Sequence, residues 1–122
     1  MGLPKAHRLR SRKDYRAVYG QGIRFYSPHL TLLALYFEQK DGSCDPATKF
    51  GVSISKKVSK KAVVRNRIKR QIKSAIIVNL QIISPGWKIV IVVKPQAIKC
   101  NYEHFLRELE ELLKQAKIIN GY

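Results

Sequence analysis

The sequence predicts an α/β fold, an α+β sandwich in which helices pack on a central sheet. Helix-like and strand-like apolar patterns alternate along the 122 residues, in the order helix, strand, strand, helix, strand, helix (α-β-β-α-β-α). The length suits one domain with its own core. The hydrophobic content of 45% excludes a disordered basic tail. No repeat or linker divides residues 1–122, so we expect a single domain with a flexible basic tail over 1–9 and a loop over 38–49.

The first helix is expected to begin after Ser11. Asp14 follows three residues later and would complete a capping pair with it. Tyr15, Val18 and Tyr19 then recur at helical spacing and share one face. Two interpretations of the tyrosines stay open: they form the buried face of an amphipathic helix, or they present rings to a ligand.

Three segments are expected to be strands. The run LTLLALYF at 30–37 is apolar on both alternating faces, which is typical of a strand covered on both sides. FGVSIS at 50–55 alternates strictly, and Gly51, Ser53 and Ser55 form a small, polar face that would leave a shallow floor. WKIVIVVK at 87–94 is rich in β-branched residues and ends at Pro95.

Two longer helices complete the pattern. The first is expected from a cap at Ser59 to about Leu80, and the second begins after Asn101, which can cap it. Each carries an apolar stripe at helical spacing. The members of the two stripes are Val64, Ile68, Ile72, Ala75 and Ile76, and then Tyr102, Phe105, Leu106, Leu109, Leu112, Leu113 and Ala116.

The net charge of +16 is concentrated in two segments. Residues 1–26 hold seven basic side chains and one acid, and residues 56–73 hold nine basic side chains and no acid. The rest of the chain is close to neutral. Such concentration indicates a surface for a polyanion, with nucleic acid the leading candidate and an anionic membrane surface second. No apolar run approaches the roughly 18 residues of a membrane span, and the basic N-terminus precedes no apolar stretch of the kind found in secretory signals. We therefore expect a cytoplasmic protein.

The basic residues of 56–73 would cover one side of a helix. Arg65, Lys69 and Lys73 stack at i, i+4 spacing, where like charges repel one another unless another molecule supplies the compensating charge. Arginine matches phosphate oxygens with a planar fork of donors, and the amide of Asn66 can both donate and accept. The alternative is a solvated helix face, which would normally mix charges of both signs.

This segment, VSKKAVVRNRIKRQIKSA at 58–75, resembles the signature of the bacterial ribonuclease P protein subunit. The shared pattern is Arg65-Asn66-Arg67, then Lys69-Arg70, preceded by Lys56-Lys57 at a strand end. FGVSISKK resembles the family's strand before that pair, and RLRSRKDYRAVYGQG at 8–22 resembles its N-terminal stretch. The family usually has phenylalanine where this chain has Tyr15 and Tyr19. The resemblance covers nearly the whole chain.

The resemblance implies a ribosomal protein S5 domain 2-like fold containing a left-handed βαβ crossover. It also implies a function as the protein component of ribonuclease P, a ribonucleoprotein endoribonuclease that hydrolyses one phosphodiester to remove the 5′ leader of precursor tRNA. The catalytic core would be an RNA subunit with Mg²⁺ bound mainly by that RNA. The protein would bind the RNA subunit and the precursor tRNA, contact the single-stranded leader, and raise affinity for substrate and Mg²⁺. No membrane or DNA partner is implied.

The resemblance also assigns two sets of residues. The expected contact to the RNA subunit consists of Lys60, Lys61, Arg65, Asn66, Arg67, Lys69, Arg70 and Lys73. The expected contact to the leader consists of Arg12, Tyr15, Tyr19, Ser53, Ser55, Lys56 and Lys57. Aromatic rings beside a basic groove suit single-stranded RNA because bases stack on them with little regard to sequence.

No catalytic residue and no metal ligand are expected in the protein itself. His7, His29 and His104 are scattered, and none has a carboxylate or cysteine nearby in the sequence at ligand spacing. Cys44 and Cys100 are interpreted as incidental thiols. Two rival classes share the size and charge: a structural RNA-binding protein of the ribosomal kind, and a helix-based DNA-binding protein. The latter normally pairs its reading helix with another helix, whereas this basic helix lies between two strands.

Overall fold

The computed structural model describes residues 3–37 and 47–118. Cys44 and most of the expected loop at 38–49 lie outside the described residues. Three α-helices and four strands form the fold: α1 (Arg12–Gln21), β1 (Ile23–Tyr26), β2 (Leu30–Tyr36), β3 (Lys49–Ser53), α2 (Ala62–Asn79), β4 (Trp87–Val93) and α3 (Tyr102–Gln115). Three short 3₁₀ segments accompany them: η1 (Lys5–His7), η2 (Leu80–Ile82) and η3 (Pro95–Lys99). The predicted α/β class is confirmed.

The sheet is mixed, with strand order β1-β2-β4-β3. β2 runs antiparallel to both β1 and β4, whereas β3 runs parallel to β4. The chain connects β3 to β4 through α2, and this is the βαβ unit for which the resemblance implies a left-handed crossover. β1 and β3 are therefore the two edges of the sheet.

The expected element order lacked one strand. β1 follows α1 directly and pairs with β2, so the observed order is α-β-β-β-α-β-α rather than α-β-β-α-β-α. Three of the four residues of β1 are exposed. A short edge strand of this kind has no buried alternating face, and therefore carries no periodic signal in the sequence.

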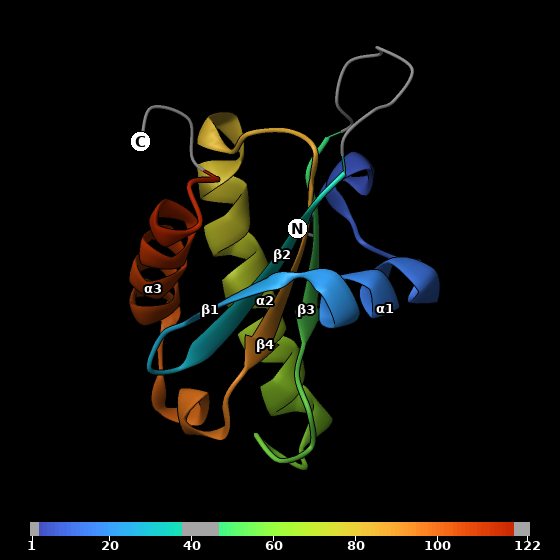
Figure 1. Cartoon of the computed structure of the whole chain (residues 1–122). Coiled ribbons are helices and arrows are strands. Elements are labelled where there is room, and N and C mark those ends of the chain that lie inside the picture. Colours follow the sequence, from blue (N-terminus) through green and yellow to red (C-terminus); the bar gives the residue numbers. More distant parts are fainter. Residues whose placement is uncertain (1–2, 38–46, 119–122) are drawn as a thin grey trace.

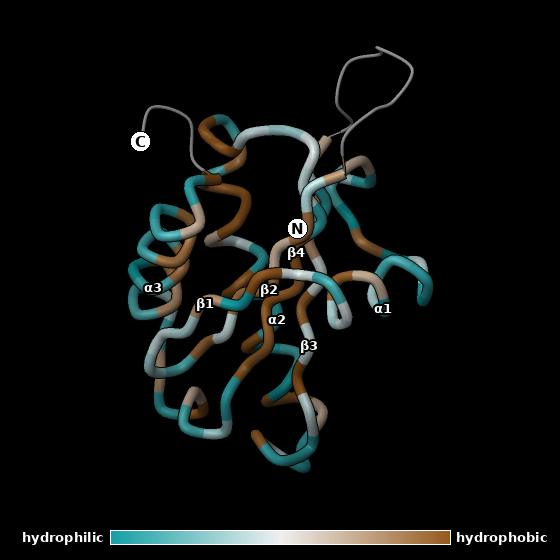
Figure 2. The backbone as a smooth tube through the Cα atoms, in the orientation of Figure 1, coloured by the Kyte–Doolittle hydropathy of each residue, from teal (hydrophilic) through white to brown (hydrophobic). Residues whose placement is uncertain are grey.

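Two layers cover the sheet unequally (Figure 1). α2 and α3 pack side by side on one face, where Ile68, Ile72, Phe105 and Leu109 join the main core with no exposed surface. α1 covers only part of the other face, through Val18 and a smaller apolar cluster. Figure 2 shows hydrophobic residues concentrated along β2, β4 and α2, while α1 is mainly hydrophilic. One face of the sheet is thus partly open.

Two of the three helices begin where the sequence predicts, α1 after Ser11 and α3 after Asn101. The Asn101 cap is confirmed, since its Oδ1 accepts the His104 N–H at 3.0 Å. The capping pair at the first helix is wrong: Ser11 makes no side-chain cap bond, and Asp14 instead accepts from Lys88 Nζ at 2.8 Å. The third prediction is also wrong, since α2 begins at Ala62.

Ser59 has a different role from the predicted cap. Its hydroxyl accepts the N–H of Lys61, the residue immediately before α2, at 3.2 Å. Its carbonyl accepts from Arg65 Nη1 at 2.8 Å. The serine therefore shapes the turn that leads into α2.

The described part of the expected tail, residues 3–9, packs against the sheet. Leu3 and Leu9 are buried, and the Leu9 N–H donates to the Phe50 carbonyl at 2.9 Å. His7 Nδ1 lies 2.8 Å from the Thr48 carbonyl oxygen. This segment follows the outer edge of β3 as far as Phe50. Within the described residues, no helix is both long and apolar enough to cross a membrane.

Candidate nucleic-acid interface

The basic residues of α2 lie on its outer side. Ile68, Ile72, Ala75 and Ile76 are buried against the sheet and α3. Every member of the expected contact to the RNA subunit is at least partly exposed: Arg65, Lys69 and Lys73 are half-buried, and Lys60, Lys61, Asn66, Arg67 and Arg70 are exposed. No ion pair within the described chain involves any of these cations. Their charge is therefore available to an anionic partner.

The approach to α2 is a turn that holds four lysines outward. Val58 is buried and anchors the turn, while Lys56, Lys57, Lys60 and Lys61 are exposed. The Lys57 N–H donates to the Ser55 hydroxyl at 3.2 Å. The guanidinium of Arg65 is tied to this turn by its bond to the Ser59 carbonyl, whereas Arg67 is exposed and has no hydrogen-bond partner among the described residues. The two arginines of the motif therefore differ: one braces the turn and the other is free for a partner.

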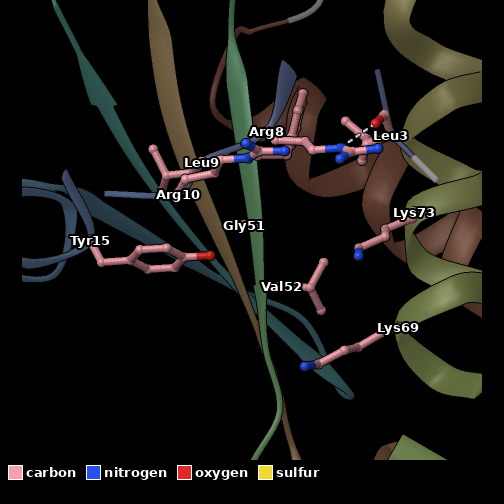
Figure 3. A pocket seen from close by; sticks show the side chains of 10 residues that line it. Leu3, Arg8, Leu9, Arg10, Tyr15, Gly51, Val52, Lys69 and Lys73 are labelled. Carbon is pink, nitrogen blue, oxygen red and sulfur yellow. Dashed lines mark hydrogen bonds between the residues drawn. The ribbon is translucent and has the colours of Figure 1, made fainter. Parts of the chain in front are cut away.

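A pocket of about 230 Å³ lies at the outer edge of β3. In Figure 3 the Tyr15 ring reaches the strand from one side with its hydroxyl toward Gly51, and Lys69 and Lys73 of α2 lie on the other side. β3 is the last strand of the sheet, so past Phe50 no described strand pairs with its outer edge. Arg8 and Arg10 complete the basic lining. One tyrosine from the expected leader set thus shares a pocket with two lysines from the expected RNA-subunit set.

Gly51 allows this approach of the Tyr15 ring. A Cβ built on Gly51 would lie 2.7 Å from Tyr15 Cζ and 2.8 Å from Cε1, well inside van der Waals contact. Burial, and secondarily the neighbouring Tyr19, raises the pKa of Tyr15 above its usual value. The hydroxyl therefore stays protonated at neutral pH and can donate a hydrogen bond.

A second pocket, of about 240 Å³, lies on the open part of the sheet. Tyr19 of α1 and Tyr26 of β1 line it, with 39% and 61% of their surface exposed. Arg24 also lines it, and Nη2 of that residue donates to the Tyr19 carbonyl at 3.3 Å. The floor is formed by Thr31, Leu33 and Val92. This pocket combines two exposed rings with a cation.

The two tyrosines of α1 thus divide between the two interpretations. Tyr15 is half-buried and packs against the cluster of Leu9, Val18, Leu33 and Val90, while one side of its ring faces the first pocket. Tyr19 is exposed and lines the second pocket.

Ser53 lines neither pocket, but it lies on the same face of the sheet as the two tyrosines. It pairs with Val92 across the parallel ladder, and Gly51 two residues earlier pairs with Val90. Because side chains two residues apart share a face, Ser53 lies on the α1 side of the sheet, next to Val92, which lines the second pocket. Arg12, Ser55, Lys56 and Lys57 line neither pocket. The structure therefore brings only Tyr15, Tyr19 and Ser53 of the expected leader set to the open sheet face.

Sequence reasoning missed Arg24 and Tyr26. Both lie on β1, whose existence was not predicted. A weak signal was present, since Arg24 and Tyr26 lie two positions apart and would share a face of any strand there.

His29 also differs from expectation. Its Nδ1 lies 2.7 Å from Glu108 Oε2, and Cys100 is close enough that one ligand atom from each of the three residues lies within 4.8 Å of the others. No carboxylate or cysteine lies at ligand spacing from His29 in the sequence, yet the fold brings one of each to it, because three distant segments supply the cluster. Burial acts to raise the pKa of Glu108, but hydrogen bonds from Ser27 and His29 hold it below its usual value. Burial and the Glu108 charge raise the pKa of the Cys100 thiol.

Comparison with known proteins gives one consistent result. Residues 3–117 match the family model described as Ribonuclease P. The ribonuclease P protein component of Microcystis aeruginosa is 55% identical over all of both chains. That of Rippkaea orientalis is 56% identical over all of this chain and 95% of its own. The solved structure of the Staphylococcus aureus RNase P protein superposes with a TM-score of 0.80 at 28% identity, over 95% of this chain and all of the other.

Proposed function

Because the chain belongs to the ribonuclease P protein family, we propose that its two basic segments divide the RNA of that ribonucleoprotein endonuclease between them: α2 contacts the RNA subunit, and the open sheet face contacts the leader of precursor tRNA. Family membership makes it the protein component of a tRNA-processing enzyme with a ribonuclease P RNA as partner. The division of surfaces and the residues assigned to each are our proposal.

The observation that carries the proposal is the pocket shared by Tyr15, Lys69 and Lys73. Tyrosine offers a face for a base, and lysine offers charge for the adjacent phosphate. A strand leaving the α2 surface would cross the free edge of β3 and reach Ser53 and then the Tyr19 pocket. The junction of two RNA segments would thus lie at the edge of the sheet.

The second pocket suits bases of any sequence. Stacking on an exposed ring contributes about 1–3 kcal/mol per base and tolerates all four bases. Leaders differ among tRNAs, so a surface built from Tyr19, Tyr26 and Arg24 meets the requirement better than base-specific hydrogen bonds would. Arg24 supplies the charge that keeps the backbone near the rings.

The protein would raise Mg²⁺ affinity indirectly. Among the described residues, one group of three or more potential metal ligands occurs, and it offers a histidine nitrogen and a cysteine sulfur beside a single carboxylate, whereas Mg²⁺ prefers a shell of oxygen ligands. Asp14, the acid closest to the basic segments in sequence, is paired with Lys88. These residues do not fit a protein-borne Mg²⁺ site, and we assign the ion to the RNA subunit. Cations on α2 would instead neutralise RNA phosphates and help the RNA adopt its active arrangement.

Reconstitution with a cognate ribonuclease P RNA tests this function. At low Mg²⁺ the protein should accelerate cleavage of a precursor with a leader of several nucleotides. The gain should shrink for a precursor with a one-nucleotide leader, and binding of mature tRNA should be little affected. Equal stimulation of both precursors would refute leader contact, and absence of stimulation would refute the function as a whole.

A further inference from the structure

We propose that His29, Cys100 and Glu108 form a binding site for a zinc-class divalent metal ion, at the edge of the second pocket. The three residues come from different parts of the fold: the turn between β1 and β2, the residue after η3, and the middle of α3. A metal ion held there would tie these three segments together.

The distances suit a metal ion. One donor atom from each residue, namely a ring nitrogen, a thiol sulfur and a carboxylate oxygen, lies within 4.8 Å of the other two. Zn²⁺ binds such atoms at about 2.0–2.3 Å in a tetrahedral arrangement, in which ligand atoms are about 3.3–3.8 Å from one another. Small side-chain rotations would bring the set to that spacing. The 2.7 Å between His29 Nδ1 and Glu108 Oε2 would open slightly as the ion replaces the shared proton.

The carboxylate is already oriented for this role. Glu108 Oε1 accepts from the Ser27 hydroxyl at 2.6 Å and from the His29 N–H at 2.9 Å. These bonds fix the carboxylate and leave Oε2 directed at the imidazole. Metal sites commonly use such outer hydrogen bonds to hold a ligand in place. The side chains of His29 and Glu108 are 29% and 12% exposed, so the site is partly shielded but remains open to an ion.

The ligand set selects against Mg²⁺. A nitrogen, a sulfur and an oxygen suit a borderline ion such as Zn²⁺, whereas Mg²⁺ requires an octahedron of oxygens. Three protein ligands leave a fourth position for water. Binding would displace the thiol proton of Cys100 to solvent, so affinity should rise with pH. The site would therefore bind Zn²⁺ in preference to Mg²⁺ even at the Mg²⁺ concentrations at which ribonuclease P works.

The surroundings favour a cation here more than elsewhere on this basic chain. Four of the eight acidic residues lie on α3: Glu103, Glu108, Glu110 and Glu111. The site also adjoins the second pocket, because Ser27 directly follows Tyr26. Lys94 Nζ donates to the Ser27 carbonyl at 2.6 Å and lies 5.7 Å from the Tyr26 ring centroid. A bound ion would hold the end of β1 that carries Tyr26.

The alternative is a hydrogen-bonded clamp in which Glu108 fastens the turn to α3 and Cys100 has no part. The two accounts differ in the role of the thiol, and this chain offers a matched control because it has a second cysteine, Cys44.

Cobalt titration of the untagged full-length protein, under a thiol-free phosphine reductant, tests the site. We expect one Co²⁺ per chain, a thiolate-to-metal charge-transfer band, retention of that band in excess Mg²⁺, and displacement by one equivalent of Zn²⁺. Cys44→Ser should leave the band and the affinity unchanged, and Cys100→Ser should abolish the band and weaken binding at least tenfold. Zn²⁺ should raise the thermal unfolding midpoint of the wild type and of Cys44→Ser, but not of Cys100→Ser.

Three results would overturn the proposal: no charge-transfer band, a band that survives Cys100→Ser, or one ion shared by two chains. Because Cys100→Ser keeps the size of the side chain, it should fold. His29→Gln provides a second variant. Its thermal unfolding midpoint without metal measures how much the hydrogen bond between His29 and Glu108 contributes to stability, apart from any effect of metal binding.

Discussion

Replacing Gly51 with alanine should move the Tyr15 ring without removing it. The added methyl would lie 2.7 Å from Tyr15 Cζ and 2.8 Å from Cε1, where carbon atoms normally stay about 3.5–4.0 Å apart. The ring must therefore shift by about 1 Å. The clash involves the outer end of a half-buried side chain rather than backbone, so the side chain can give way.

The expected effects are modest in stability and selective in binding. Overpacking by one methyl costs about 1–3 kcal/mol, and a movable ring favours the lower end, which corresponds to a drop of about 3–5 °C in the unfolding midpoint. If the displaced ring loses about 1 kcal/mol of contact with the leader, precursor affinity falls about fivefold. Affinity for mature tRNA should not change.

The assay compares the binding of precursor and mature tRNA to the reconstituted enzyme, with thermal unfolding followed in parallel. Gly20→Ala is the matched control, because nothing lies within 4 Å of the added methyl and the residue is helical. That variant should be stabilised by about 0.5–1 kcal/mol with unchanged affinity. Tyr15→Phe should also bind normally, since it keeps the ring. Equal losses for precursor and mature tRNA, or no loss in Gly51→Ala, would refute the assignment of Tyr15 to the leader.

Three further predictions concern other parts of the interface. Arg67→Ala should reduce the slope of log affinity against log salt for the RNA subunit by about 0.7–0.9 without lowering the unfolding midpoint. The control Arg107→Ala, on α3, should leave the slope unchanged, and equal slopes in the two variants would refute a phosphate contact by Arg67. The 2.8 Å ion pair between Asp14 and Lys88 should show a coupling energy of about 1 kcal/mol in a double-mutant cycle measured by urea unfolding, because both side chains are partly shielded from solvent. A coupling energy near zero would mean that the ion pair does not hold α1 to β4. Tyr26→Ala should lower precursor affinity by about 1 kcal/mol or more. The stability of the protein should not change, since 61% of Tyr26 is exposed, and a loss of stability instead would place the ring in the core.

The parts of the fold with strong periodicity could be predicted from the sequence. The stripe from Ile68 to Ile76 and the stripe from Phe105 to Leu113 are both buried as expected. The continuous apolar runs of β2 and β4 also form adjacent strands at the centre of the sheet. In each case burial on one face produces a local pattern that needs no knowledge of distant residues.

The missed features depend on residues that are distant in sequence. Asp14 looks like a helix cap locally, but a lysine on β4 provides a stronger partner than a backbone N–H. The cluster at His29 is assembled from three segments that only the folded chain brings together. β1 was missed for another reason: as an exposed edge strand it has no buried face to mark it.

The candidate site shows the same limit. The sequence predicts a basic helix and an aromatic helix as two surfaces, and both are present. It does not predict that Tyr15 shares a pocket with Lys69 and Lys73 at the free edge of β3, because that arrangement follows from the strand order. The order of parallel and antiparallel strands is set by the whole sheet rather than by any one segment.

Site-specific crosslinking tests the proposed division of surfaces most directly. A photoreactive phenylalanine analogue would be placed at Tyr19 in one variant and at Arg70 in another, and each protein would be assembled with RNA subunit and precursor tRNA. The variant at position 19 should label the precursor leader, and the variant at position 70 should label the RNA subunit. Labelling of the RNA subunit from both positions, or of the leader from position 70 alone, would contradict the division.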